Sequence, residues 1–106
     1  MNRELELYEL ILLIKFTADS KEKIERYRNF LTEKGSQVMV KSHGKKSLAY
    51  PIKGFETASY IQVVYLGNGD LVKQISTEIQ RDESILRSVT TKLKDQDIAE
   101  MFTTAS

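Results

Sequence analysis

The feature that most constrains the fold of this 106-residue chain is the spacing of its apolar residues. From one segment to the next, this spacing switches between the alternation of a strand and the period of a helix. Alternating or short continuous apolar runs predict strands over about residues 7–16, 37–53, 58–66 and 85–93. Apolar spacings of three and four residues predict amphipathic helices over about residues 21–34 and 71–81. The predicted order is therefore strand-helix-strand-strand-helix-strand, although the last strand alternates too unclearly to assign its inner face.

This order predicts an α+β fold in which both helices cover the same face of a four-stranded antiparallel sheet. Two helices cannot cover both faces of four strands, which leaves the second face bare. The arrangement is the ferredoxin-like split βαβ, or βαββαβ. Right-handed crossovers make strands one and three central neighbours and place strands two and four at the edges. Pro51 has no ladder donor and fits an edge strand.

Length and composition predict a single domain over residues 1–106, with a folded core at about 7–93 and a tail at 94–106. No apolar run reaches transmembrane length, so no membrane is expected as a partner. The net charge of +1 does not by itself indicate nucleic-acid binding, so any RNA contact must come from local charge. The chain has no cysteine, which excludes disulfides and thiolate chemistry.

Local patterns predict several side-chain positions. Strand parity should turn Leu48, Tyr50 and Ile52 into the core, after a bend near Gly44. In strand one, the residues expected on a single face are Leu10, Leu12, Ile14 and Phe16. The expected helix caps are Asp19, in a capping box with Glu22, and Asp70.

Residue types with catalytic or metal-binding chemistry are scarce. His43 is the only histidine, and without cysteine it argues against a metal site or a His-dependent nucleophile. The acidic pairs Glu4/Glu6 and Asp82/Glu83 are expected to be solvated, because nothing apolar around them would raise a pKa. The sequence therefore predicts no enzyme activity, no cofactor, no metal and no small-molecule substrate.

Two surface features remain as candidate binding sites. The first is a set of basic residues able to neutralise RNA phosphates: Lys41, Lys45, Lys46 and Lys53 on strand two, with Arg87 and Lys92 on strand four. A charge-balanced surface with lysines protecting the sheet edges explains the same pattern. The second is an apolar patch expected on the bare sheet face, formed by Ile11, Leu13 and Val64 and flanked by Tyr60. A protein partner, or the tail through Ile98, Met101 and Phe102, could cover it.

Three motifs stand in register along the chain. The first is Gly44-Lys45-Lys46-Ser47-Leu48-Ala49-Tyr50-Pro51-Ile52, in the second predicted strand. Tyr8-Glu9-Leu10 opens the first strand, and Asp82-Glu83-Ser84-Ile85-Leu86-Arg87 precedes the last. Together they resemble the bacterial-type ribosomal protein six family of the small subunit, and the first motif is similar to the family signature. The resemblance covers about residues 8–93 and implies the same fold.

The resemblance also implies a function and a location. It implies a non-enzymatic constituent of the small ribosomal subunit that binds the central domain of the ribosomal RNA as a heterodimer with ribosomal protein eighteen. Lys45, Lys46 and Arg87 carry over as RNA contacts, although the family often has arginines where these lysines stand. The implied location is the ribosome, in a cyanobacterial-like cytoplasm or a plastid. The alternative is a small-ligand-binding regulatory domain that forms homo-oligomers through its bare sheet.

Overall fold

The computed structural model describes residues 5–15 and 20–94. Its elements follow the predicted order, and their bounds lie within three residues of those expected from the sequence. The elements are β1 (Glu6–Lys15), α1 (Ser20–Glu33), β2 (Val38–Ile52), β3 (Phe55–Gly67), α2 (Gly69–Gln80) and β4 (Ile85–Lys92). That the whole of residues 1–106 forms one domain stays a prediction.

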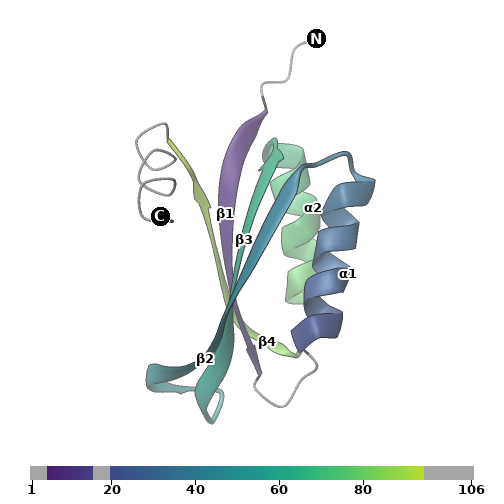
Figure 1. The fold of residues 1–106 in the computed structure, drawn as a ribbon. Coiled ribbons are helices and arrows are strands. Elements are labelled where there is room, and N and C mark those ends of the chain that lie inside the picture. The colour runs from purple at the N-terminus through teal and green to yellow at the C-terminus, as the bar shows by residue number, and fades with distance from the viewer. Residues whose placement is uncertain (1–4, 16–19, 95–106) are drawn as a thin grey trace.

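The four strands form one antiparallel sheet in the order β2-β3-β1-β4, and both helices lie on the same side of it (Figure 1). The predicted ferredoxin-like split βαβ fold is confirmed, with β1 and β3 at the centre and β2 and β4 at the edges. The lower ends of β2 and β3 extend past the helices as a long hairpin (Figure 1). The end of that hairpin therefore has no helix layer to pack against.

The core lies between the sheet and the two helices. Leu10, Leu12 and Ile14 of β1 are fully buried, as the alternation predicted, and each such side chain contributes about 1.5–3 kcal/mol through burial. Phe16, expected on the same face, lies outside the described residues. The remaining members of the core come from the helices, β3 and the start of β4: Tyr27, Leu31, Ile61, Val63, Tyr65, Leu71, Ile75, Ile79 and Ile85.

Helix α1 ends where the sequence places a glycine. Gly35 has a φ of 87°, its N–H donates to the Thr32 carbonyl at 2.9 Å, and the Ser36 N–H donates to the Leu31 carbonyl at 3.1 Å. These two bonds define a Schellman motif, which satisfies carbonyls that the helix end would otherwise leave unpaired. The proposed capping box at the other end of α1, with Asp19, lies outside the described residues.

Helix α2 begins earlier than expected, and Asp70 is not its N-cap. Asn68 is the cap, because its side-chain Oδ1 accepts from the Leu71 N–H at 3.0 Å while its backbone is extended. Asp70 lies inside the first turn, where a carboxylate still favours the positive end of the helix dipole. Asn and Asp are nearly equivalent as caps, so the sequence alone did not separate the two positions.

The expectation that Leu48, Tyr50 and Ile52 enter the core is wrong. Tyr50 is 60% exposed, and Leu48 and Ile52 are only half-buried. The register of β2 against β3 shifts between Ser42 and Gly44, where Gly44 has a φ of 76°, and shifts again before Ile52. Each irregularity interrupts the two-residue alternation, so parity read from Val38 does not hold in the outer half of the strand.

Candidate nucleic-acid and protein interface

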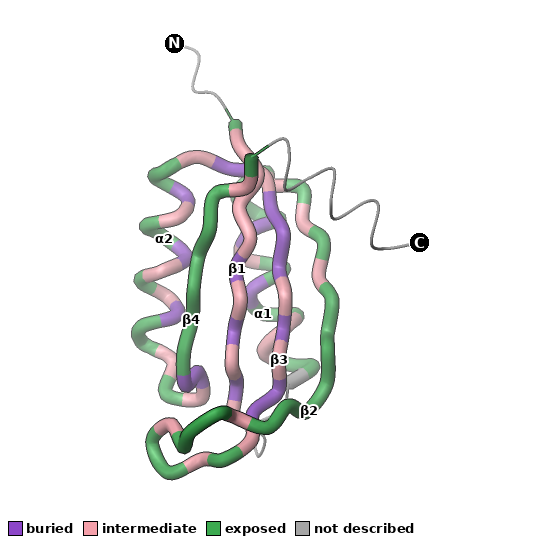
Figure 2. The backbone as a smooth tube through the Cα atoms, turned by 90° about the vertical axis from the view of Figure 1, so that its left-hand side faces the viewer, coloured by how far each residue is buried: buried purple, intermediate pink, exposed green. Residues whose placement is uncertain are grey.

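The sheet face opposite the helices, here called the open face, carries side chains aligned in rows across the four strands. Because residues paired across antiparallel strands share a face, the register identifies its members. Three rows are Thr91–Glu9–Val64–Met39, Val89–Ile11–Gln62–Lys41 and Arg87–Leu13–Tyr60–Gly44. Figure 2 shows this face with β4, β1, β3 and β2 from left to right.

The register therefore places the four residues of the predicted apolar patch together on the open face. Ile11 and Leu13 lie on β1, and Tyr60 and Val64 lie on the neighbouring strand β3. Two more apolar side chains extend the surface at its edges, Met39 at 56% exposure and Val89 at 50%. Their use as a partner interface stays a prediction, and the tail residues Ile98, Met101 and Phe102 lie outside the described residues.

At the lower end of the open face, the outer β2–β3 hairpin curls toward the sheet (Figure 2). It encloses an open cavity of about 360 Å³ between its own apolar side chains and those of β1 and β3. Arg87 of β4 donates from Nη1 to the Tyr50 hydroxyl at 3.2 Å, which links the hairpin to the opposite sheet edge. The cavity lining comprises Leu13, Lys46, Ser47, Leu48, Ala49, Tyr50, Ile52, Tyr60 and Arg87.

The six basic residues proposed for RNA do not form one cluster. Lys46 and Arg87 line the hairpin cavity, and Lys41 lies on the same face opposite Gln62. The other three residues are placed elsewhere by the register and by their contacts. Lys45 pairs with Ser59 on the helix side, Lys53 occupies the hairpin turn with a φ of 51°, and Lys92 forms an ion pair with Glu6 at 2.7 Å.

A polar network that the sequence did not reveal crosses the middle of the open face. Gln62 donates from Nε2 to Glu9 Oε2 at 2.6 Å, and its Oε1 lies 3.1 Å from His43 Nε2. The His43 ring also meets the Tyr60 ring edge-on, with centroids 5.1 Å apart. The sequence signal for this network was Gln62, a glutamine within an apolar strand. Its partners, Glu9 and His43, lie on two other strands, so the sequence did not identify them.

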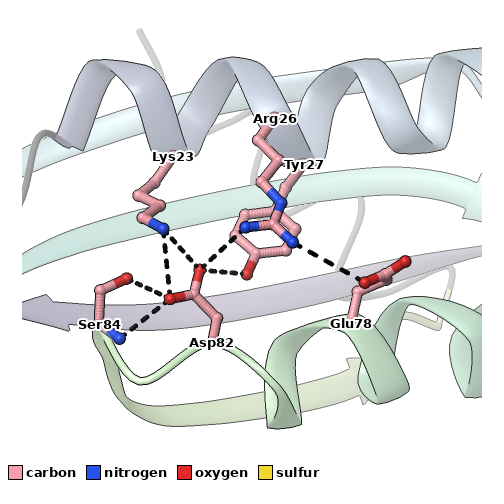
Figure 3. A network of polar contacts seen from close by, with 6 residues as sticks. All are labelled: Lys23, Arg26, Tyr27, Glu78, Asp82 and Ser84. Carbon is pink, nitrogen blue, oxygen red and sulfur yellow. Dashed lines mark hydrogen bonds and ion pairs between the residues drawn. The ribbon is translucent and has the colours of Figure 1, made fainter.

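A second network lies on the helix side and corrects the expectation that Asp82 is solvated (Figure 3). The Asp82 side chain is only 4% exposed and accepts from the Tyr27 hydroxyl at 2.7 Å. It also accepts from the Ser84 N–H at 2.9 Å and the Ser84 hydroxyl at 2.6 Å. Lys23 Nζ lies 3.1 Å from its Oδ2. The sequence could not show that α1 packs over the loop that carries Asp82.

The contacts of Asp82 decide its charge state. Burial by itself would raise the pKa of Asp82, but the hydrogen bonds from Ser84, Tyr27 and Lys23 outweigh it and hold the pKa well below its usual range. Burial and the hydrogen bond to Asp82 raise the pKa of Tyr27 above its usual range. The ionised carboxylate thus joins α1 to the turn between α2 and β4.

This network divides the third motif into two parts. Asp82 and Ser84 stabilise the turn, and Ile85 and Leu86 are buried at the start of β4. Arg87 lies on the open face, where it contacts the hairpin. The motif is therefore mainly structural, with one residue that remains available for binding.

Within residues 5–15 and 20–94, no group of three or more His, Asp or Glu side chains is arranged to hold a metal ion. Over the same residues, no helix is both long and apolar enough to span a membrane.

The fold and the site define a ferredoxin-like α+β domain whose distinctive surface is a sheet face with a basic hairpin at one end.

Comparison with known proteins identifies the family. Residues 7–92 match the family described as Ribosomal protein S6, so the chain belongs to the ribosomal protein S6 family. It is 34% identical over 94 residues to a small ribosomal subunit protein, bS6c, of Guillardia theta, covering 85% of this chain and 98% of that one. It is 35% identical to bS6 of the cyanobacterium Gloeothece citriformis, covering 84% of this chain and 53% of that longer relative.

The fold is also shared with a solved structure. The crystal structure of 30S ribosomal protein S6 from Thermotoga maritima superposes with a TM-score of 0.80 at 20% identity, covering 95% of this chain and 99% of that one. The family membership confirms the expectation of a non-enzymatic small-subunit protein of the bacterial and plastid type. It also confirms the expected location, a ribosome of the bacterial cytoplasm or a plastid.

Proposed function

We propose that the chain binds the central domain of small-subunit ribosomal RNA as a heterodimer with ribosomal protein eighteen. The observation that carries this proposal is the open face, where apolar side chains of both central strands lie between the two edge strands and end at a basic hairpin. The protein partner occupies the apolar rows, and the RNA contacts the hairpin end.

The protein part rests on the apolar side chains of the open face. Ile11 and Leu13 lie on the open face of β1, and Met39 and Val89 are at least half-exposed on the edge strands. Soluble domains seldom keep such contiguous apolar surface without a partner. The edge strands β2 and β4 also offer backbone groups to which a segment of another chain could add.

The RNA part rests on charge at the hairpin end. Lys46 and Arg87 line one cavity, and Arg87 keeps several donors besides the one it gives to Tyr50. Lys45 and Lys53 belong to the same hairpin and extend the positive charge around its other sides. Contacts of this kind neutralise phosphates and give affinity without reading base sequence. Lys92 is the weakest member of the set, because its ammonium already pairs with Glu6.

The protein interface is tested by placing two carboxylates in the apolar rows. Ile11→Glu with Val64→Glu should leave a folded protein, judged by circular dichroism, that binds ribosomal protein eighteen far more weakly in calorimetry. The control places glutamates at two exposed helix positions, Thr32 and Gln74, and should bind normally. If the double variant unfolds, these positions belong to the core. If it folds and binds normally, the interface lies elsewhere.

The RNA contacts are tested by salt dependence. Replacing Lys45, Lys46 and Arg87 together with Ala should weaken RNA binding by the heterodimer and reduce its salt slope by roughly one unit for each lost contact. A control with Ala at Lys21 and Lys73, exposed on the helix side, should keep the slope. An unchanged slope in the triple variant would remove these residues from the RNA interface.

A further inference from the structure

The charge of the open face is divided between its centre and its rim. Within the three rows that define this face, Glu9 is the only acidic residue, and it lies on the central strand β1. The cations of these three rows, Lys41 and Arg87, belong to the edge strands β2 and β4. The next row toward the hairpin adds Lys46 of β2 and Lys15 at the end of β1, both paired with Ala58. In the second motif of the sequence, Tyr8-Glu9-Leu10, the side chains of Tyr8 and Leu10 therefore lie on the helix side of the sheet, and the Glu9 carboxylate lies on the open face.

Glu9 is held in position by its neighbours rather than neutralised by them. Its Oε2 accepts from Gln62 at 2.6 Å, and Gln62 is itself held by His43. Its cross-strand neighbour Val64 is apolar and only 7% exposed. Among the residues that the structure describes, no lysine or arginine forms an ion pair with Glu9, whereas Glu6 on the opposite face pairs with Lys92.

A carboxylate that becomes buried in an interface requires a positively charged partner. A partner that covers the apolar rows also removes Glu9 from water, and an unpaired buried carboxylate is strongly unfavourable. RNA phosphate at this position would add repulsion between like charges. We propose that Glu9 is the specificity-determining contact of the open face and takes an arginine from the protein partner, while RNA is confined to the basic rim.

Arginine fits better than lysine because of the geometry of the carboxylate. Gln62 occupies one oxygen of Glu9, and among the described residues no donor is assigned to Oε1. A planar guanidinium can contact the open oxygen and still extend its apolar stem over Val64 and Ile11. This inference rests on the proposed function and names the chemistry by which the same face would choose its protein partner.

The first test is Glu9→Gln in the full chain, with Glu6→Gln as a matched control on the other face of the same strand. Glutamine keeps the size and the acceptor for Gln62 but removes the charge. Calorimetry against ribosomal protein eighteen should show affinity weakened about thirtyfold or more for Glu9→Gln, as when one member of a buried charge pair is lost. Glu6→Gln should stay within about twofold, since its pair with Lys92 lies outside the interface.

The second test is charge reversal. Each arginine of ribosomal protein eighteen is changed in turn to Glu and tested against Glu9→Arg. One of these partner variants should bind Glu9→Arg better than it binds the unchanged chain. If no partner variant does so, the arginine contact is overturned and the proposed function stands. The same conclusion holds if Glu9→Gln binds as the unchanged chain does while Ile11→Glu with Val64→Glu abolishes binding. If all of these variants bind normally, the arginine contact is overturned and the interface lies on another surface. The proposed function itself fails only if the unchanged chain does not bind ribosomal protein eighteen.

Discussion

Two buried tyrosines provide a matched pair for testing what holds the helix layer in place. The Tyr27 and Tyr65 side chains are 2% and 0% exposed, and Phe at either position removes the same single oxygen. The Tyr27 hydroxyl donates to Asp82 at 2.7 Å, whereas the Tyr65 hydroxyl is buried without a hydrogen-bond partner among the described residues. Burial, with the neighbouring Tyr8, raises the pKa of Tyr65 to about 12, so it is neutral at ordinary pH.

Of the two substitutions, only Tyr27→Phe should lower stability. Tyr27→Phe removes a hydrogen bond to a charged group, which is worth about 1.5–3 kcal/mol, and leaves the buried Asp82 with one donor fewer. Tyr65→Phe removes a hydroxyl that is already desolvated without compensation, so the free energy of unfolding should stay the same or rise by up to about 1 kcal/mol. A domain of this size has only about 5–15 kcal/mol in total, so the difference is measurable.

The assay is urea unfolding of both variants, with Asp82→Asn and the Tyr27→Phe/Asp82→Asn pair to complete a double-mutant cycle. A coupling energy of about 0.5–3 kcal/mol is expected between residues in direct contact. Equal effects of the two tyrosine substitutions, or a coupling energy near zero, would refute the view that the Asp82 network stabilises the fold.

Substitutions at Asp82, Leu48, Asn68 and Gly35 test four further features of the fold. The pKa of Asp82 is lowered in the folded state, so its stabilising contribution is complete above the ordinary aspartate pKa of about 3.9 and is lost as the pH falls below it. In acid unfolding, the stability of Asp82→Asn should therefore fall less steeply with decreasing pH than that of the unchanged chain. Leu48→Ala should lower the free energy of unfolding by only about 1 kcal/mol, because the side chain lines an open cavity. A loss of about 2–5 kcal/mol in denaturant unfolding would show instead that Leu48 is a core residue. Asn68→Ala should lose about 0.5–2 kcal/mol of stability through the missing cap, while Asp70→Ala should lose less in the same unfolding assay. Gly35→Ala should lower the thermal midpoint, since alanine is disfavoured by about 1 kcal/mol at positive φ, and an unchanged midpoint would argue against the Schellman end.

Much of the binding surface could be predicted from alternation along two strands. Ile11, Leu13 and Val64 were expected on the bare face because their neighbours Leu10, Leu12 and Val63 had to face the core, and the register places them there. The basic residues were harder to place, because they lie on the irregular edge strand β2 and on β4. Lys45 and Lys46 are adjacent in sequence, so they point to opposite sides of the ladder and only Lys46 joins Arg87.

The sequence by itself determined the number, kind and order of the elements, because the period of its apolar residues changes at each boundary. It also determined the order of the strands, because two helices and right-handed crossovers leave one arrangement with strands one and three at the centre. These are properties of short segments and of chain topology, and neither depends on a particular side-chain contact.

Only the tertiary structure decided where β2 changes its register, which carboxylate is buried and how the open face is charged. The shift at Gly44 turns Tyr50 from the expected core toward Arg87, a residue 37 positions away. Asp82 receives donors from Lys23 and Tyr27 on α1, and Glu9 is held by Gln62 of β3. Each of these outcomes depends on contacts between segments far apart in the chain, and local propensity and alternation carry no information about which distant groups will meet.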